Sequence, residues 1–151
     1  GGQPRTHEHY TDQTRRTRGW PRISELLDQL GYRVGPDEVD RRLAVMASDR
    51  DKWMWVAETG NRLLVGCLQA TVDRRLAEGD HLEVTSLVVD GGCRGKGVGR
   101  QLVAVAESLG KAIGSRRMRV RCNRKRSLAH GFYRGLGYAE AKIQTVFEKD
   151  L

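Results

Sequence analysis

The chain has few cysteines, few aromatic residues and no long apolar run. Its three cysteines in 151 residues are an odd number at wide spacing without a C-x-x-C pair, so neither a disulfide framework nor a zinc site is indicated. No apolar run approaches the ~20 residues of a membrane helix, and no apolar centre typical of a signal peptide stands near the N-terminus. We therefore expect a reducing, cytoplasmic compartment, no membrane partner and no metal.

Basic residues are in excess. The formal net charge is +8, and seven arginines and lysines crowd residues 116–126. Either a nucleic acid or a small anion with several phosphates would suit such a surface. Arg119 and Arg121 alternate with apolar residues, which is typical of a half-exposed strand with a solvated polar face. Because no aromatic platform interleaves the cluster, nucleic acid is the weaker of the two partners.

A glycine-rich, basic turn joins an apolar strand to a helix at residues 88–100. Its alternating glycines let the backbone approach a ligand and point several N–H groups into one concavity, to which the helix adds its positive end. A Walker loop is excluded because Gly97 follows Lys96 where a hydroxyl should stand, and a dinucleotide fingerprint is excluded because Leu102 falls on its last glycine. The turn predicts an anionic ligand of another kind.

Two segments resemble motifs of the GCN5-related N-acetyltransferases (GNAT). Residues 94–99, RGKGVG, match the family's R/Q-x-x-G-x-G/A loop, which binds the pyrophosphate of coenzyme A. Residues 123–138 are similar to its N-x(n)-A-x-x-FY-x-x-LGF/Y segment and follow in the right order at the right separation. The resemblance covers about residues 20–151 and implies acetyl-coenzyme A as cofactor. The chain departs from the family at Gly91, where a proline is common, and this predicts a looser loop entrance.

The resemblance implies an α/β fold with one GNAT-type domain over residues 20–151. Its central sheet would be mixed and mostly antiparallel, with about six or seven strands flanked by about four helices, and would splay at the cofactor site. Residues 1–19 are predicted to be a flexible N-terminal arm, with an expression-tag remnant or an irregular first strand within 5–18 as alternatives. The two histidines of that arm receive no role.

Hydrophobic periodicity predicts the order of the remaining elements. The expected elements are a helix ending at Gly31 with Ile23, Leu26, Leu27 and Leu30 on one face, a helix opening at Pro36 with Val39, Leu43 and Met46 buried, a hairpin of Trp53–Glu58 and Arg62–Asp73 turning at Thr59–Asn61, a strand Glu83–Val89, a helix capped by Gly110, a short strand closed by Asn123, a helix near 127–136, and a final hairpin in 138–149 with Val146 and Phe147 in the core.

Acetyl transfer requires a neutral amine, so the site needs a base or a water chain leading to one. Glu83 stands at the entry of the motif strand, where the family often places its catalytic glutamate, and we assign it the base, acting through water. Glu58 and Asp80 are held in reserve. Tyr133 matches the family tyrosine whose hydroxyl faces the sulfur, and it would protonate the leaving thiolate, with Phe132 on the opposite, core-facing side of the helix.

The resemblance also assigns contacts to the cofactor. Asn123 would bond the pantetheine arm, which would pair like an added strand with the exposed backbone edge of the motif strand. Cys93 lies in the phosphate loop, far from the thioester end, so direct attack in a ternary complex is preferred to an acetyl-enzyme. The expected cofactor-binding residues are Leu87, Val88, Val89, Arg94, Gly95, Lys96, Gly97, Val98, Gly99, Arg100 and Asn123.

The sequence thus predicts an N-acetyltransferase that moves the acetyl group of acetyl-coenzyme A to a primary amine. The acceptor would be a small cationic amine, such as an aminoglycoside or a polyamine, or a protein amine, and an acyl group other than acetyl stays open. A homodimer also stays open. Two other classes remain as alternatives, namely a coenzyme A-binding regulatory module without turnover and a nucleic-acid-associated basic protein.

Overall fold

The computed structural model describes the backbone of residues 5–8 and the complete residues 22–151. The chain forms two compact units, of which the first ends at Arg121 and the second is Cys122–Leu151. The first unit holds the sheet, and the second holds one helix, α4 (Ser127–Gly135), followed by the C-terminal segment. Apart from 5–8, the predicted arm of residues 1–19 lies outside the described residues.

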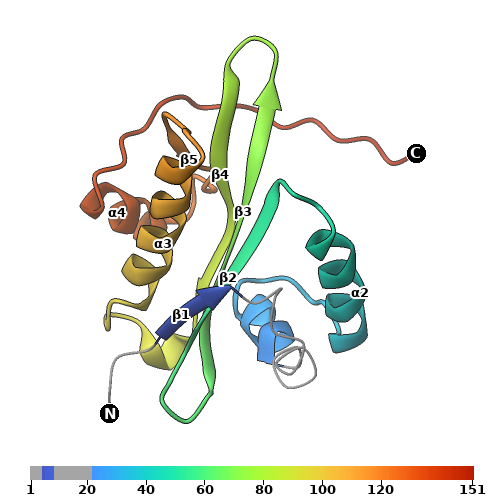
Figure 1. Ribbon diagram of the computed structural model, residues 1–151, viewed down its shortest axis with the longest axis vertical. Helices are drawn as coiled ribbons and strands as arrows, with labels where there is room; N and C mark the ends of the chain where they lie inside the picture. The colour runs from blue at the N-terminus through green and yellow to red at the C-terminus, as the bar shows by residue number, and fades with distance from the viewer. Residues whose placement is uncertain (1–4, 9–21) are drawn as a thin grey trace. The chain divides into compact units, whose positions relative to one another are not determined.

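The first unit is built on a mixed sheet whose strands lie side by side in chain order, β1-β2-β3-β4-β5 (Figure 1). The first three pairings are antiparallel, and β5 is parallel to β4. The mixed, mostly antiparallel sheet is confirmed, but the described residues hold five strands instead of six or seven. The strands are β1 (Arg5–Glu8), β2 (Lys52–Glu58), β3 (Leu64–Arg75), β4 (Gly79–Val89) and β5 (Met118–Val120).

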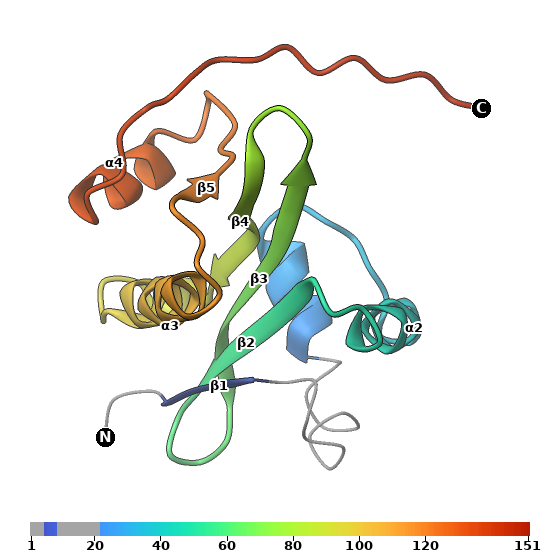
Figure 2. The ribbon, with the colours of Figure 1, turned by 45° about the horizontal axis from the view of Figure 1, so that its top comes forward.

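Helices lie on both faces of this sheet (Figure 2). One face carries α3 (Val98–Ala112), and the other carries α2 (Pro36–Ala47) and a helix over residues 22–29, which we call the first helix. A 3-10 turn, η1 (Gly91–Cys93), precedes α3. With α4, four α-helices are present in the part of the chain that the structure describes, and none of them has the length and apolar character of a membrane span.

The first helix and α2 each bury one apolar stripe against the sheet. Ile23 and Leu26 are three residues apart and Val39 and Leu43 are four apart, so each pair lies on one helix face, and all four side chains are buried. The predicted buried faces of both helices are confirmed at these positions. Together with the strands they form one cluster, whose other buried members are Met54, Val56, Leu64, Cys67 and Val88.

On the opposite face α3 approaches β3 closely because Gly66 has no side chain. A Cβ atom at Gly66 would stand 2.9 Å from Cγ1 of Val98 and 3.1 Å from Cδ1 of Leu102. Val98 is the first residue of α3. The contact therefore fixes where the helix begins relative to the sheet, which matters because the glycine-rich loop ends at that point.

Several predicted boundaries move by a few residues. The irregular first strand that the sequence left open exists as β1, paired with β2 from Arg5 to Glu8. In the β2–β3 turn it is Arg62, at φ +64, that takes the left-handed backbone, and not the glycine or asparagine before it. The predicted helix cap at Gly110 is wrong, because α3 continues to Ala112 and Gly114, at φ +78, follows it.

The final hairpin expected in residues 138–149 is also wrong, since residues 138–151 form neither helix nor strand. Val146 and Phe147, expected in the core, are 75% and 90% exposed. A two-stranded hairpin is marginally stable in water unless further strands or a helix pack against it. The described residues of the second unit offer α4 and no further strand.

Candidate functional site

The edge of β4 becomes open halfway along the strand. β5 pairs with β4 only from Leu82 to Val84, whereas β4 continues to Val89 with β3 on its other side. The pairing with β3 slips by one residue at this point, which places Thr85 in a bulge. Beyond the bulge, the backbone groups that Leu87–Val89 turn away from β3 are not taken up by β5, and they can bond an extended ligand.

From this edge the chain runs directly into the glycine-rich loop and the N-terminus of α3. Gly95 and Gly97 have φ +78 and +82, in the left-handed region that favours glycine. Gly97 is the N-cap of α3, and its carbonyl accepts the first helical hydrogen bond, from the N–H of Gln101. The N–H groups of residues 98–100 have no partner within the helix, so together with the helix dipole they favour an anion here.

Three cations surround these N–H groups. Arg94, Lys96 and Arg100 are exposed, and no carboxylate among the residues described by the structure forms an ion pair with them. The structure therefore brings together the predicted loop residues 94–100 and the predicted strand edge in one continuous stretch. Unpaired cations, free N–H groups and a helix N-terminus are the features of a phosphate site.

The entrance of the loop is anchored by the first helix. The amide of Gln29 donates from Nε2 to Oδ1 of Asp90 at 2.7 Å, and its Oε1 accepts the N–H of Gly91 at 2.9 Å. Arg22 lies 3.3 Å from the same carboxylate. The hydrogen bond from Gln29, helped by Arg22, lowers the pKa of Asp90. The expectation of a loose entrance at Gly91 is wrong, because the N–H that a proline would lack is bonded here.

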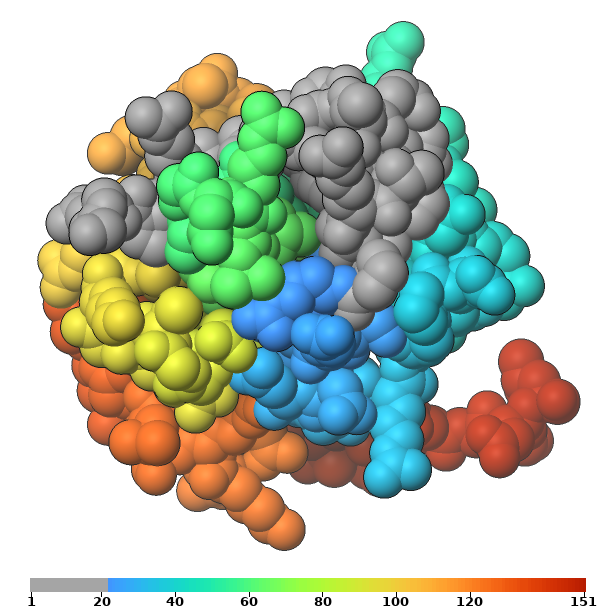
Figure 3. Space-filling model, turned by 90° about the horizontal axis from the view of Figure 1, so that it is seen from below, coloured from blue at the N-terminus to red at the C-terminus, as the bar shows by residue number. Residues whose placement is uncertain are grey.

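Figure 3 shows the first helix and this loop on one surface of the molecule, the helix in blue and the loop in yellow. They are far apart in the sequence and adjacent in space, in agreement with the Gln29 hydrogen bonds. The sequence offered no signal for this anchor, because a glutamine on an exposed helix position has many ordinary uses.

Glu83 lies on β4 two residues before the bulge. Glu83 pairs with Thr71 of β3, and Val88 pairs with Cys67 of β3. Cys67 lies four residues before Thr71, so these two residues are on the same face of β3. Glu83 therefore shares the face of Val88, which the first helix and α2 cover. Its side chain is 12% exposed, and Oε1 accepts from Nε of Arg121 at 2.9 Å. The predicted base thus stands beside the opening edge of β4.

The two reserve carboxylates lie elsewhere. Glu58 is the last residue of β2 and is buried. The β2 residue level with Glu83 is Lys52, because Lys52 and Glu83 both pair with Thr71. Glu58 lies six residues, or about 20 Å, along β2 from Lys52. Asp80 is on the opposite face of β4 from its neighbour His81. It forms an ion pair with Arg74. Neither reserve residue adjoins the bulge.

Two side chains that the sequence analysis missed accompany Glu83. His81 precedes it by two residues on β4, and Asp73 faces His81 across the β3–β4 pair, so all three share one face. One ligating atom from each lies within 4.8 Å of the others. Arg75 and Arg121 already form ion pairs with the two carboxylates, and this compensated charge disfavours a metal cation. Alternation along β4 combined with the hairpin register could have revealed the group.

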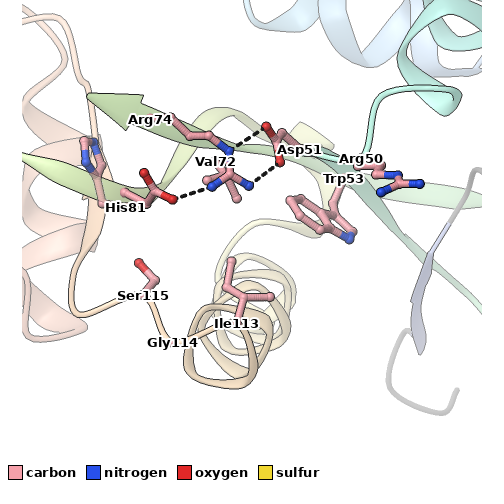
Figure 4. A pocket seen from close by; sticks show the side chains of 10 residues that line it. Arg50, Asp51, Trp53, Val72, Arg74, His81, Ile113, Gly114 and Ser115 are labelled. Atoms are coloured by element: carbon pink, nitrogen blue, oxygen red, sulfur yellow. Dashed lines mark hydrogen bonds and ion pairs between the residues drawn. The ribbon is translucent and has the colours of Figure 1, made fainter. Parts of the chain in front are cut away.

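A pocket of about 290 Å³ lies at the other end of α3 (Figure 4). Arg74 bridges Asp51 and Asp80 on one side, and Ile113 and Ser115, just after α3, line the other. α3 has 15 residues, so this pocket stands about 22 Å along the helix from the glycine-rich loop. Its lining includes Asp80, one of the two reserve carboxylates, which is paired with Arg74, and also His81.

Tyr133 belongs to the second unit, on α4. It is buried, with its ring edge-on to those of Phe132 at 5.0 Å and Tyr138 at 5.7 Å between centroids. Burial, followed by the neighbouring Cys122 and Tyr138, raises the pKa of the phenol, so it is protonated at neutral pH. Phe132 was expected to face the core and Tyr133 to face the site. This is wrong, because Phe132 is only half-buried and Tyr133 is the more buried of the two.

Asn123 also belongs to the second unit and lies three residues after β5 ends at Val120. Its Oδ1 accepts the N–H of Lys125 at 3.0 Å, an arrangement that stabilises the turn before α4. Its side-chain NH₂ group is therefore the part suited to donate to a ligand carbonyl.

The sequence model of the acetyltransferase (GNAT) family matches residues 20–138, which include the open strand edge, the loop and α4. The chain belongs to the acetyltransferase (GNAT) family. No curated protein sequence matches it. The match agrees with the two motifs from which the resemblance was inferred.

Solved GNAT-like structures share the fold at low sequence identity. Aminoglycoside N-acetyltransferase AAC(6')-Iy in complex with CoA has a TM-score of 0.85 at 16% identity, over 100% of this chain and 97% of that one. Glucosamine-6-phosphate N-acetyltransferase from Arabidopsis thaliana gives 0.78 at 22%, over 99% and 100%. A transcriptional regulator from Bacillus halodurans gives 0.77 at 20%, over 95% and 99%.

Proposed function

We propose that this GNAT protein transfers the acetyl group of acetyl-coenzyme A to a primary amine by direct attack in a ternary complex. One observation carries the proposal: the edge of β4 opens at the Thr85 bulge and leads without interruption into a loop with unpaired cations and free N–H groups. An extended pantetheine arm that ends in a pyrophosphate has the same order of features.

In this proposal the cofactor lies along β4 with its phosphates at α3. The backbone of Leu87–Val89 pairs with the pantetheine amides, and the N–H groups of residues 95–100 bind the pyrophosphate. Arg94, Lys96 and Arg100 supply the opposing charge. The bound CoA of the aminoglycoside acetyltransferase that shares the fold supports coenzyme A as the cofactor.

Glu83 is proposed as the base for the acceptor. A carboxylate next to the open edge can accept a proton from the incoming ammonium, directly or through one water. The bond from Arg121 uses one carboxylate oxygen, and the second oxygen can accept a hydrogen bond from the incoming ammonium. The neutral amine then attacks the thioester carbonyl, and the carbon–sulfur bond breaks.

Tyr133 is proposed to protonate the departing thiolate, and Asn123 to bond the pantetheine arm. Both assignments come from the family pattern in residues 123–138. Burial raises the pKa of the Tyr133 phenol, so the hydroxyl carries a proton at neutral pH, and the same shift makes that proton harder to give up.

The proposed acceptor is a small cationic amine or a protein amine. Two of the fold relatives are named for aminoglycoside and glucosamine-6-phosphate acetylation, which supports a small amine. A cytoplasmic location stays a prediction of the sequence.

The test is calorimetric titration with acetyl-coenzyme A, followed by thiol release against aminoglycosides, polyamines, glucosamine 6-phosphate and a lysine peptide. We expect micromolar binding and thiol release with one class of amine. Glu83→Gln should lower kcat about 10²-fold or more with little change in cofactor affinity. Absence of cofactor binding in the wild-type protein would overturn the proposal.

A regulatory module that binds coenzyme A without turnover is the second candidate, because a transcriptional regulator shares the fold. It would bind the cofactor and release no thiol with any amine. A nucleic-acid role has less support, since Arg119 and Arg121 of the basic region form ion pairs with Glu78 and Glu83. Steep salt dependence of DNA or RNA binding would be its signature.

A further inference from the structure

His81 is a buried histidine whose environment calls for an explanation. It is 6% exposed, and Nε2 has no hydrogen-bond partner among the described residues. A buried polar atom without a partner costs about 1–3 kcal/mol, so such atoms mark bound water or a functional role. The nearest acceptor is Oδ2 of Asp73, at 3.5 Å, slightly beyond a good hydrogen bond.

Distances connect this imidazole to the proposed base. A carboxylate oxygen of Glu83, an imidazole nitrogen of His81 and a carboxylate oxygen of Asp73 lie within 4.8 Å of one another. Two groups at that separation are bridged by one water molecule that forms a hydrogen bond to each. His81 lies two residues nearer the β3–β4 hairpin than Glu83 on the same face of β4, and Asp73 stands directly across from His81 on β3.

We propose that His81 is the proton acceptor behind Glu83, with Asp73 stabilising the imidazolium. This rests on the proposed function. The acceptor R–NH₃⁺ gives a proton to Glu83, and Glu83 gives it through water to His81. The amine attacks the acetyl carbonyl, the carbon–sulfur bond breaks, and the thiolate takes a proton from its acid. The second proton lost from the acylated nitrogen restores that acid, and the proton on His81 leaves to solvent. His81 acts through Glu83 and is a positioning residue, not a group that touches substrate.

The charges around the imidazole favour this role. Asp73 of β3 faces His81 and is itself paired with Arg75. Glu83 of β4 lies on the same face as His81. Glu78 in the hairpin turn pairs with Arg119 of β5, Arg121 pairs with Glu83, and Lys52 of β2 contacts Thr71 at the next register position. Asp73 and Glu83 are each paired with an arginine, which leaves Nε2 of the imidazole as the atom of this cluster without a hydrogen-bond partner among the described residues.

The test compares pH profiles of kcat for wild type, His81→Gln and Asp73→Asn, with thiol release as the assay. We expect His81→Gln to lower kcat about tenfold at pH 7 and to recover to within about threefold at pH 9, where water and free amine replace the relay. Asp73→Asn keeps the imidazole without its charge partner, so the acidic limb should move to lower pH by about one unit. Imidazole in the buffer should restore part of the activity of His81→Ala.

Asp51→Asn is the matched control, because it also removes a carboxylate paired with an arginine, Arg74, at the far end of α3. It should keep the wild-type profile. If Asp73→Asn and His81→Gln both keep that profile while wild type turns over, the relay is overturned and the proposed function stands. If His81→Gln does not fold, Asp73→Asn alone decides. If wild type releases no thiol with any amine, both fail.

Discussion

The basic side chains at the two ends of β4 differ in whether carboxylates pair with them. Toward the hairpin, the arginines are paired with carboxylates: Arg74 with Asp51 and Asp80, and Arg75 with Asp73. Toward the loop, Arg94, Lys96 and Arg100 have no such partner among the described residues. Paired charges hold a structure together, whereas a cluster of unpaired cations beside a helix N-terminus is kept for a ligand.

The largest expected effect is a difference in the alkylation rates of two cysteines, Cys67 and Cys93, near the loop end of β4. Burial raises the pKa of Cys67, opposite Val88 on β3, to about 12 from 9.0. Its thiolate at pH 8 is therefore roughly a thousandfold rarer than that of an ordinary thiol. Iodoacetamide labelling followed by mass spectrometry should modify Cys93, on the loop, first. Labelling of Cys67 should begin only as pH nears 12 or the protein unfolds, and rapid labelling at pH 8 would contradict its burial.

Charge reversal tests the contrast directly. Lys96→Glu combined with Arg100→Glu should weaken coenzyme A binding about 10²-fold, because two charge-assisted contacts are replaced by repulsion. The control, Arg74→Glu at the hairpin end, should change affinity less than twofold. Calorimetry at two salt concentrations measures both. Equal losses in the two variants would show that only the overall charge matters.

A glycine that packs against the loop end of α3 should contribute more to the free energy of unfolding than a glycine in a surface turn. Gly66→Ala would place its Cβ atom 2.9 Å from Val98 and should cost about 1–3 kcal/mol of unfolding free energy. Gly60→Ala meets no atom within 4 Å and serves as control. Urea denaturation measures both variants. If Gly66→Ala is as stable as Gly60→Ala, the helix is not held by this contact.

Substitution of two glycines that share the left-handed backbone conformation should separate the effect on stability from the effect on cofactor binding. Gly97→Ala, at φ +82 in the loop, and Gly79→Ala, at φ +77 at the start of β4, should each cost about 1–2 kcal/mol of stability. Only Gly97→Ala should also weaken coenzyme A binding, by distorting the N–H groups at α3. Melting curves with and without coenzyme A measure both effects. A loss of cofactor stabilisation in Gly79→Ala would argue against the assigned site.

Local pattern was enough to predict much of this fold. The i, i+3 spacing of Ile23 and Leu26 predicted the first helix correctly, because such a pattern depends on neighbours in the chain. The anion site expected from the glycine spacing of residues 95–99 stays a prediction. The cap at Gly110 was misread because a glycine inside a helix can serve close packing, here against Met118 and Leu82, as well as end the helix.

Contacts between distant segments could not be predicted in the same way. Gln29 bonds a loop 61 residues away, and the group formed by Asp73, His81 and Glu83 depends on the exact β3–β4 register. A single sequence does not specify such pairings. The C-terminal hairpin failed for a related reason, because strand propensity favours a strand pair without supplying the further strands or helix that would stabilise it.

The bulge at Thr85 determines which chemistry each face of the sheet receives. Cys67 and Thr71 are four residues apart on β3, but their partners Val88 and Glu83 are five apart on β4. If the same residues formed a regular ladder without the bulge, Glu83 and His81 would turn toward α3, and Asp80 and Leu82 would turn to the other face. One extra residue in β4 therefore decides which face of the sheet carries the carboxylate and the histidine, although no residue of the loop differs.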